Sequence, residues 1–187
     1  MDSERLEEAF DVVDRDKFMP ANVRHMAGYD QAMPIGYGQT ISQPYTVNLM
    51  LQWLDPRPGD KVLDVGSGSG WTTALLAHLV GLKGKIFAVE RIPELVEFGR
   101  DNCERFGVKN AEFYTAGDEF GWPEEAPFDR ILVSASADEL PQTLIDQLKV
   151  GGKLVIPVQY DILEITKEPK DKIKTVKHPG FVFVPLL

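Results

Sequence analysis

Only one cysteine, Cys103, occurs in the chain, so no disulfide can form within it. No apolar run approaches the ~20 residues that a membrane-spanning helix needs. The first five residues, MDSER, are mostly polar and contain no apolar core of the kind found in secretory signals. We therefore expect a cytoplasmic protein without a membrane partner. Cys103 lies in a helical pattern with no histidine near it in sequence, which favours buried packing over nucleophilic work.

Basic residues are fewer than acidic ones, 20 against 29, and the formal net charge is −9. No dense run of lysine or arginine occurs, although binding to nucleic acid through its phosphates needs such a basic surface. The three histidines form no obvious constellation with acidic residues. We therefore expect no nucleic-acid partner and no bound metal. The length of 187 residues suits one domain with a sizeable core, which we expect to be a monomer.

Glycine is concentrated in one informative stretch, residues 61–71, which reads KVLDVGSGSGW. An apolar run typical of a strand stops at three glycines, and an apolar helical segment then begins. This order brings backbone N–H groups and a helix N-terminus up to a ligand. Trp71 stands where the third glycine of a dinucleotide-phosphate loop would be, which favours a ligand without a pyrophosphate, such as S-adenosylmethionine. The alternative is a tight turn that only packs strand on helix. The candidate cofactor residues are Gly66, Ser67, Gly68, Ser69 and Gly70.

Strand-like and helix-like segments alternate through the rest of the chain. Apolar strands are expected at 62–65, 86–89, 112–115, 128–134 and 153–157, with a tight turn at the glycine pair 151–152. This alternation predicts an α/β fold with a mainly parallel sheet and helices on both faces. Segments 162–166 and 181–184 are expected to form a C-terminal antiparallel pair, joined by the charged loop 167–177.

Several polar residues follow directly after predicted parallel strands. Ligands in such sheets bind beyond the carboxyl ends of the strands, so the glycine loop, Glu90, Asp118 and Ser134 should share one crevice. Glu90 follows the loop by about 20 residues, the offset at which an acidic side chain can accept hydrogen bonds from ribose hydroxyls. The alternative for Glu90 is an exposed acid at a strand end.

A second informative stretch covers residues 30–45, where two glycines flank Tyr37. Pro44 suits the first turn of a helix, which the apolar spacing continues to Asp55. Ser42 therefore lies at or beside the N-cap of that helix, and capping alone is one interpretation of this serine.

Five segments together resemble the protein-L-isoaspartate O-methyltransferase family: PIGYGQTISQP at 34–44, VLDVGSGSG at 62–70, APFDRI at 126–131, QLKVGGKL at 147–154 and FVPL at 183–186. The resemblance covers nearly the whole chain, and the segment 36–44 is its most specific part. It implies a class I, Rossmann-like methyltransferase fold. It also implies methyl transfer from S-adenosyl-L-methionine to the carboxylate of L-isoaspartyl residues in damaged proteins or peptides, which starts their repair.

The resemblance also implies roles for single residues. Ser42 matches the active-site serine, Glu90 the ribose-binding acid and Asp118 an acid near the adenine, with Arg91 and Glu119 beside them in the cofactor site. The implied substrate-binding residues are Ile35, Gly36, Tyr37, Gly38, Gln39 and Thr40. Two departures stand out: Glu119 replaces a usual glycine, and the segment after Val158 lacks the usual glycine-containing loop.

These departures leave two alternative functions open. One is a methyltransferase that uses the same cofactor on a small molecule or RNA, and the other is a catalytically weak or inactive cofactor-binding module. A nicotinamide-dependent oxidoreductase is disfavoured by Trp71. We expect residues 1–187 to form a single methyltransferase domain. Within it, 1–55 supply N-terminal helices and a substrate-side lid, 56–158 the cofactor-binding core, and 159–187 the C-terminal antiparallel strands.

Overall fold

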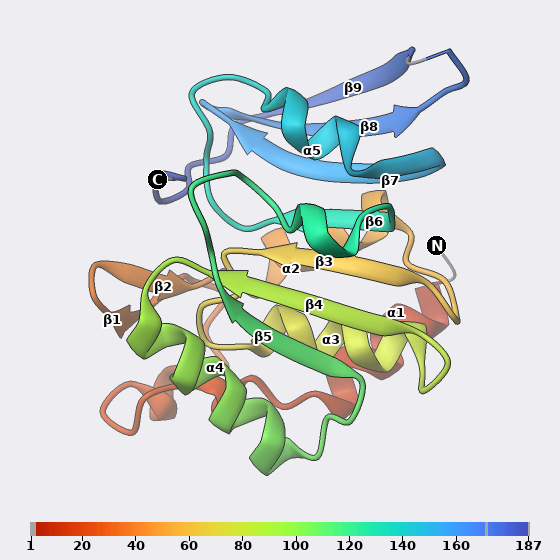
Figure 1. The fold of residues 1–187 in the computed structure, drawn as a ribbon. Helices are drawn as coiled ribbons and strands as arrows, with labels where there is room; N and C mark the ends of the chain where they lie inside the picture. The colour runs from red at the N-terminus through yellow and green to blue at the C-terminus, as the bar shows by residue number, and fades with distance from the viewer. Residues whose placement is uncertain (1–2, 171, 187) are drawn as a thin grey trace.

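The computed structural model describes residues 3–170 and 172–186. In this part of the chain, seven strands form one sheet in the order β5-β4-β3-β6-β7-β8-β9 (Figure 1). Within this sheet β3 to β7 are mutually parallel, and β8 and β9 each pair antiparallel with the strand before them. The strands are β3 (Lys61–Val65), β4 (Lys85–Glu90), β5 (Ala111–Thr115), β6 (Phe128–Val133), β7 (Leu148–Val158), β8 (Asp161–Lys167) and β9 (Ile173–Pro179). The predicted α/β fold with a mainly parallel sheet is confirmed.

Helices cover both faces of the sheet, but unequally. One core contains residues of α1 (Ser3–Val12), α2 (Pro44–Leu54), α3 (Trp71–Val80) and α4 (Pro93–Phe106). The other core contains the short helix α5 (Gln142–Asp146), with Trp122 just before the 3-10 turn η3 (Pro123–Glu125) packed against it. Successive residues along β3 enter different cores: Val62 packs with the first set of helices and Leu63 with the second. This alternation follows from the two-residue side-chain period of a strand.

The glycine pair at 151–152 lies inside β7, so the prediction of a tight turn before a strand starting at Lys153 was wrong. The pairing of β6 with β7 shifts between Phe128, opposite Leu148, and Arg130, opposite Lys153. Extra residues of β7 are therefore accommodated in a bulge. A side chain on Gly152 would put its Cβ 2.9 Å from the Asp129 carbonyl oxygen. The glycine permits the strand to pass close to its neighbour, and the chain continues without turning.

The C-terminal antiparallel pair exists, but its second member was assigned wrongly. β8 pairs with β9, which runs through the segment predicted to be a charged loop. β9 is an edge strand with almost every residue exposed, so it carries lysines where a central strand would carry apolar residues. Residues 181–184, predicted to be the strand, are outside the sheet. His178 of β9 stacks on Trp53 of α2 with ring centroids 3.7 Å apart, which fixes the edge strand to the helical layer.

A separate two-stranded hairpin precedes α2. Its strands are β1 (Met33–Gly36) and β2 (Gln39–Ile41), and the sequence pattern did not predict them. Two 3-10 turns, η1 (Arg15–Phe18) and η2 (Arg24–Met26), connect α1 to this hairpin. In Figure 1 the hairpin lies near the carboxyl ends of β3 and β4, where α/β sheets bind ligands.

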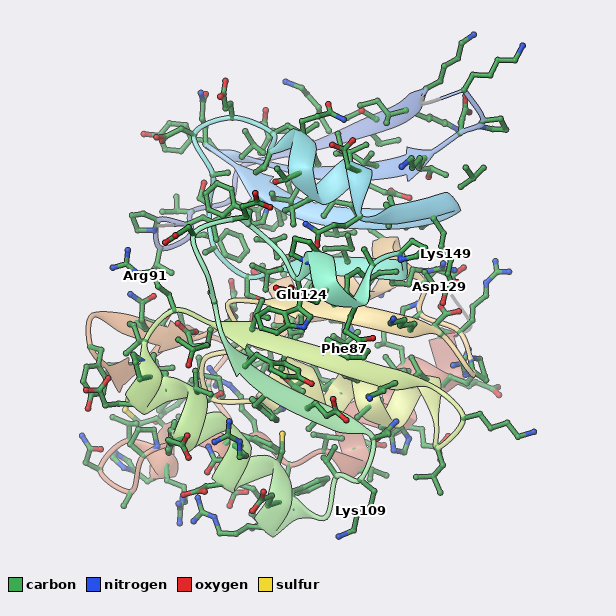
Figure 2. All side chains as sticks on the ribbon, viewed as in Figure 1. Phe87, Arg91, Lys109, Glu124, Asp129 and Lys149 are labelled. Atoms are coloured by element: carbon green, nitrogen blue, oxygen red, sulfur yellow. The ribbon has the colours of Figure 1, made fainter. Side chains whose placement is uncertain are left out.

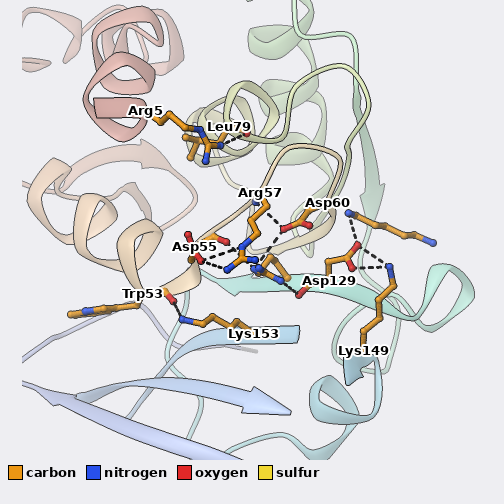
Figure 3. Close-up of polar contacts among 11 residues, drawn as sticks. Arg5, Trp53, Asp55, Arg57, Asp60, Leu79, Asp129, Lys149 and Lys153 are labelled. Carbon is orange, nitrogen blue, oxygen red and sulfur yellow. Dashed lines mark hydrogen bonds and ion pairs between the residues drawn. The ribbon is translucent and has the colours of Figure 1, made fainter. Parts of the chain in front are cut away.

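Polar contacts near the amino-terminal ends of the parallel strands connect neighbouring elements. Asp129 accepts from the Lys61 backbone N–H at 2.9 Å and from Lys149 Nζ at 2.8 Å, and Lys153 Nζ donates to the Trp53 carbonyl oxygen at 2.9 Å (Figure 3). Figure 2 places Asp129 and Lys149 at the opposite end of the sheet from Arg91. Among residues 3–170 and 172–186, no helix has the length and apolar character needed to span a bilayer.

Candidate active site

A cavity of about 470 Å³ opens beyond the carboxyl ends of β3, β4 and β6. Its walls come from the β1–β2 hairpin, the glycine loop after β3, the end of β4, the loop after β5 and the C-terminal segment. The lining residues are Ile35, Gln39, Thr40, Ile41, Ser42, Val65, Gly66, Ser67, Gly68, Ser69, Thr72, Val89, Glu90, Arg91, Ile92, Ala116, Gly117, Asp118, Glu119, Phe120, Gly121, Ser134, Ala135, Val184, Pro185 and Leu186. The crevice expected to join the glycine loop, Glu90, Asp118 and Ser134 is therefore present.

The glycine loop has a conformation that side chains disfavour. Gly66, Gly68 and Gly70 have φ angles of +77°, +48° and +82°. The backbone N–H groups of Gly66 and Ser67 both donate to the Val89 carbonyl oxygen, at 2.9 and 3.2 Å. These bonds fix the loop to the end of β4. A Cβ on Gly68 would lie 3.3 Å from Ile35 Cδ1, so the hairpin approaches the loop closely at this point.

Gly70 is the one predicted loop residue that does not line the cavity. It precedes α3, and its carbonyl oxygen accepts a hydrogen bond from Cys103 Sγ at 3.3 Å. Cys103 is 2 % exposed, and burial raises the pKa of its thiol. The expected packing role of Cys103 is confirmed.

The carboxylate of Glu90 bridges the glycine loop and the start of α4. Oε2 accepts from the Gly68 backbone N–H and Oε1 from the Ile92 backbone N–H, each at 3.0 Å. The residue is 8 % exposed and lines the cavity, so it is not the exposed strand-end acid of the alternative interpretation. Each oxygen keeps a further lone pair with which it can accept from a ligand hydroxyl.

A second carboxylate, Asp64, lies fully buried beneath the loop and was not among the predicted site residues. Thr73 Oγ1 donates to its Oδ2 at 2.6 Å. Burial, opposed by this bond and reinforced by the charge of Glu90, raises the pKa of Asp64 to about 7. Its Oδ1 and the buried hydroxyl of Ser67 have no hydrogen-bond partner among the described residues. The only sequence signal for Asp64 is an acid between apolar residues of a buried strand.

The hairpin divides the predicted substrate residues into two groups. Ile35, Gln39 and Thr40 line the cavity together with Ser42. Gly36, Tyr37 and Gly38 form the hairpin tip outside the lining, with φ angles of +98°, +55° and +72°. Tyr37 is 60 % exposed, so it faces solvent rather than the cavity. The N-cap of α2 is Gln43, which places Ser42 beside the cap rather than at it.

The loop after β5 forms the opposite wall, where the predicted Asp118 and Glu119 both line the cavity. Gln147 binds the backbone of this loop: its Oε1 accepts from the Trp122 backbone N–H at 2.8 Å, and its Nε2 donates to the Phe120 carbonyl oxygen at 2.9 Å. Trp122 also stacks on Tyr114, with ring centroids 4.5 Å apart. Arg91, which was predicted too, lies just beyond the end of β4 (Figure 2).

The C-terminal segment contributes Val184, which the sequence pattern assigned to a strand, together with Pro185 and Leu186. The Ser136 backbone N–H donates to the Val184 carbonyl oxygen, and the Leu186 N–H donates to the Ser136 carbonyl oxygen, both at 2.8 Å. These bonds hold Pro185 against the end of the sheet. The FVPL motif was the only sequence signal for this contribution, and it gives no residue a role.

The chemical character of the cavity is that of a binding and aligning site. Its ionisable lining side chains are Glu90, Arg91, Asp118 and Glu119, and no histidine, lysine or cysteine is among the described lining residues. The lining therefore lacks histidine, the side chain that most often acts as a general base near neutral pH. It suits a reaction whose nucleophile is already ionised.

Comparison with known proteins identifies the family. The profile of the protein-L-isoaspartate(D-aspartate) O-methyltransferase family (PCMT) matches residues 1–187. The chain is 45 % identical to the protein-L-isoaspartate O-methyltransferase of Pyrococcus horikoshii, covering 99 % of this chain and 86 % of that protein. It is 46 % identical to the same enzyme of Methanothrix thermoacetophila, covering 99 % and 89 %.

A crystal structure from Plasmodium falciparum is similar over the whole fold. It is described as a protein-L-isoaspartate O-methyltransferase in complex with S-adenosyl-L-homocysteine. The TM-score is 0.89 at 30 % identity, and the match covers 100 % of this chain and 92 % of that one. The fold, the cavity and the relatives agree, and the chain belongs to the protein-L-isoaspartate(D-aspartate) O-methyltransferase family.

Proposed function

We propose that this protein transfers a methyl group from S-adenosyl-L-methionine to the side-chain-like carboxylate of L-isoaspartyl residues in damaged proteins or peptides. The observation that carries this proposal is the cavity itself, which joins the glycine loop on one wall to Ser42 and the inner hairpin residues on another. Residues 1–187 act as one methyltransferase domain in this proposal, with the hairpin as its substrate-side lid.

The residues present fit the cofactor. A volume of about 470 Å³ is within the range of small-molecule sites. Ser67 offers a buried hydroxyl without a partner among the described residues, and Glu90 lines the cavity at the end of β4, where an acidic side chain can accept from ribose hydroxyls. We assign cofactor binding to residues 66–69, Glu90, Arg91, Asp118 and Glu119, and a packing role to Gly70. When bound, S-adenosylmethionine supplies an electrophilic methyl group on a sulfonium sulfur.

The acceptor needs little chemical activation. A carboxyl group with an ordinary pKa near ~4 is ionised at neutral pH, so no general base is required. The chain has to hold one carboxylate oxygen in line with the methyl group and exclude water. Ser42 is the donor that we assign to the second carboxylate oxygen, and Gln39 and Thr40 line the approach from the hairpin. Substrates are proteins or peptides rather than nucleic acid in this proposal, which the net charge of −9 supports.

A paired peptide assay tests this function. Methyl-labelled S-adenosylmethionine is incubated with an isoaspartyl peptide and with its aspartyl twin, and label released as methanol by mild base is counted as carboxyl ester. We expect ester on the isoaspartyl peptide alone. Transfer to an RNA or small-molecule acceptor instead of the peptide would support the first alternative function. Cofactor binding by calorimetry without transfer to any acceptor would support the inactive binding module.

A further inference from the structure

Arg15, in the short turn η1, binds an unusual number of backbone carbonyl groups. The residue is 7 % exposed, and its two terminal nitrogens donate to oxygens from two separate segments, residues 27–31 and 41–42. Nη1 donates to Ala27 O and Tyr29 O, each at 3.1 Å, and Nη2 donates to Gln31 O at 2.7 Å, Ser42 O at 3.0 Å and Ile41 O at 3.4 Å. One side chain thus joins the segment before the hairpin to the segment after it.

The same guanidinium also contacts the residue that follows the glycine loop. Its Cζ lies 5.4 Å from the ring centroid of Trp71, in a cation–π arrangement. Trp71 is the first residue of α3, directly after the glycine loop, and its Nε1 donates to the Val13 carbonyl oxygen at 3.2 Å. Arg15 is therefore a physical link between the backbone of Ser42 and the base of the glycine loop.

The Arg15 contacts form one clamp on this region, and the Asp30 carboxylate forms a second one on the residues that follow Ser42. Asp30 Oδ1 accepts from the Tyr45 backbone N–H at 2.8 Å, and its Oδ2 accepts from Gln43 Nε2 at 3.0 Å. Gln43 Oε1 in turn accepts from Thr46 Oγ1 at 3.0 Å. Ser42 thus lies between a cation that binds its own carbonyl oxygen and an anion that binds its neighbours. Its backbone is restrained on both sides.

From this arrangement we propose that Arg15 is a positioning residue for methyl transfer, which sets the position of the Ser42 hydroxyl relative to the glycine loop. The inference rests on the function proposed above. Arginine suits this role because the two terminal nitrogens of its planar fork both donate, whereas lysine is a compact charge with three donors on a flexible stem; the third nitrogen, Nε, has no partner among the described residues. Arg15→Lys keeps the charge and cannot reach five carbonyl oxygens at once, so it separates positioning from charge.

Arg15→Lys is compared with a matched control, Arg130→Lys. Arg130 is also 7 % exposed and donates to Asp55 O at 3.0 Å and Asp129 O at 2.8 Å, at the other end of the sheet. We expect Arg15→Lys to lower kcat for the isoaspartyl peptide at least tenfold, with S-adenosylhomocysteine affinity within twofold of wild type. Arg130→Lys should keep kcat within twofold, at a temperature where both variants are folded. A kcat within twofold for Arg15→Lys, or a parallel loss of cofactor affinity, overturns the proposal.

A double-mutant cycle tests whether Arg15 acts through Ser42. In a Ser42→Ala background, Arg15→Lys should lower kcat by less than threefold, because the group that it positions is gone. A loss of tenfold or more in that background assigns Arg15 a general structural role and overturns the proposal.

Amide hydrogen exchange separates this proposal from the proposed function. Arg15→Lys should speed exchange of a fragment covering residues 33–45 at least tenfold, while a fragment covering β6 stays unchanged. Unchanged exchange at 33–45 refutes the positioning role of Arg15, whatever the wild-type activity is. Failure of wild-type protein to methylate the isoaspartyl peptide refutes the proposed function, and the exchange result still decides the clamp.

Discussion

The backbones of Gly70 and Gly99 approach so closely that a side chain on either would collide with backbone. A Cβ on Gly70 would lie 2.7 Å from the Gly99 carbonyl oxygen, and a Cβ on Gly99 would lie 2.8 Å from the Gly68 carbonyl oxygen. Asn102, one turn further along α4, donates Nδ2 to the Ser69 carbonyl oxygen at 2.9 Å. Helix α4 therefore packs directly against the glycine loop. Gly70, the third glycine of the motif, permits this close contact.

Gly99→Ala tests this support. Alanine gains about 1 kcal/mol of helix propensity over glycine, but forcing a methyl group against backbone typically costs about 1 to 3 kcal/mol. We expect lower stability in urea unfolding and about tenfold weaker binding of S-adenosylhomocysteine, because the Gly68 backbone must move. Asp101→Ala, at an exposed position of the same helix, is the control. Cofactor affinity equal to wild type in Gly99→Ala would show that the loop tolerates the displacement.

Ser42→Ala tests the catalytic assignment. A hydrogen bond to a charged group contributes about 1.5 to 3 kcal/mol, so we expect kcat for the isoaspartyl peptide to fall about 10- to 100-fold. Cofactor affinity, measured by calorimetry, should stay within twofold. Ser136→Ala removes a serine hydroxyl that donates to Gln159 O at 3.1 Å outside the lining, and it should keep full activity. Unchanged turnover in Ser42→Ala would return Ser42 to a purely structural role.

Glu90→Gln tests the cofactor assignment. The amide keeps the size of the side chain, but it loses the charge and one of the two acceptor oxygens that bind Gly68 and Ile92. Because charge-assisted hydrogen bonds are about twice as strong as neutral ones, we expect S-adenosylhomocysteine to bind about 10- to 100-fold more weakly. Glu94→Gln, on the exposed first turn of α4, should bind normally. Equal affinities of the two variants would refute a role of Glu90 in binding.

Asp64 predicts a pH dependence of stability. Its pKa in the folded protein is about 7, above the ordinary value of 3.8, so the folded state binds a proton where the unfolded chain has released it. The contribution of Asp64 to stability therefore falls as pH rises from about 4 to about 7, by an amount on the order of 4 kcal/mol, and is level above that pH. Asp64→Asn cannot ionise and should lack this component.

Urea unfolding of wild type and Asp64→Asn at pH 5 and pH 8 measures this contribution of Asp64 to stability. The difference between wild type and Asp64→Asn isolates Asp64 from the other titrating groups, because those groups are present in both proteins. We expect Asp64→Asn to gain stability relative to wild type on going from pH 5 to pH 8. A constant difference between the two proteins across this interval would mean that Asp64 keeps one protonation state throughout.

Periodicity predicted those elements whose residues are buried on repeating positions. The strands β3, β4 and β6 consist mostly of buried apolar residues, so their place in a parallel sheet followed directly. Prediction failed where exposure or backbone freedom removes the pattern. Edge strand β9 carries charges on an exposed ladder, and the glycines at 151–152 form a bulge inside β7, where the sequence resembled a turn. The β1–β2 hairpin is too short to show a period.

The chain's local patterns alone determined the α/β class, the glycine loop after the first sheet strand, and the acid at the end of the next. They did so because backbone conformation and strand burial depend on neighbouring residues. Only the tertiary structure decided which of these residues meet. In it Gly70 lies outside the cavity lining, Tyr37 is exposed to solvent, and Val184 and Pro185 of the C-terminal segment line the cavity. It also revealed Arg15, whose five carbonyl partners lie 12 to 27 residues away, beyond the reach of any local pattern.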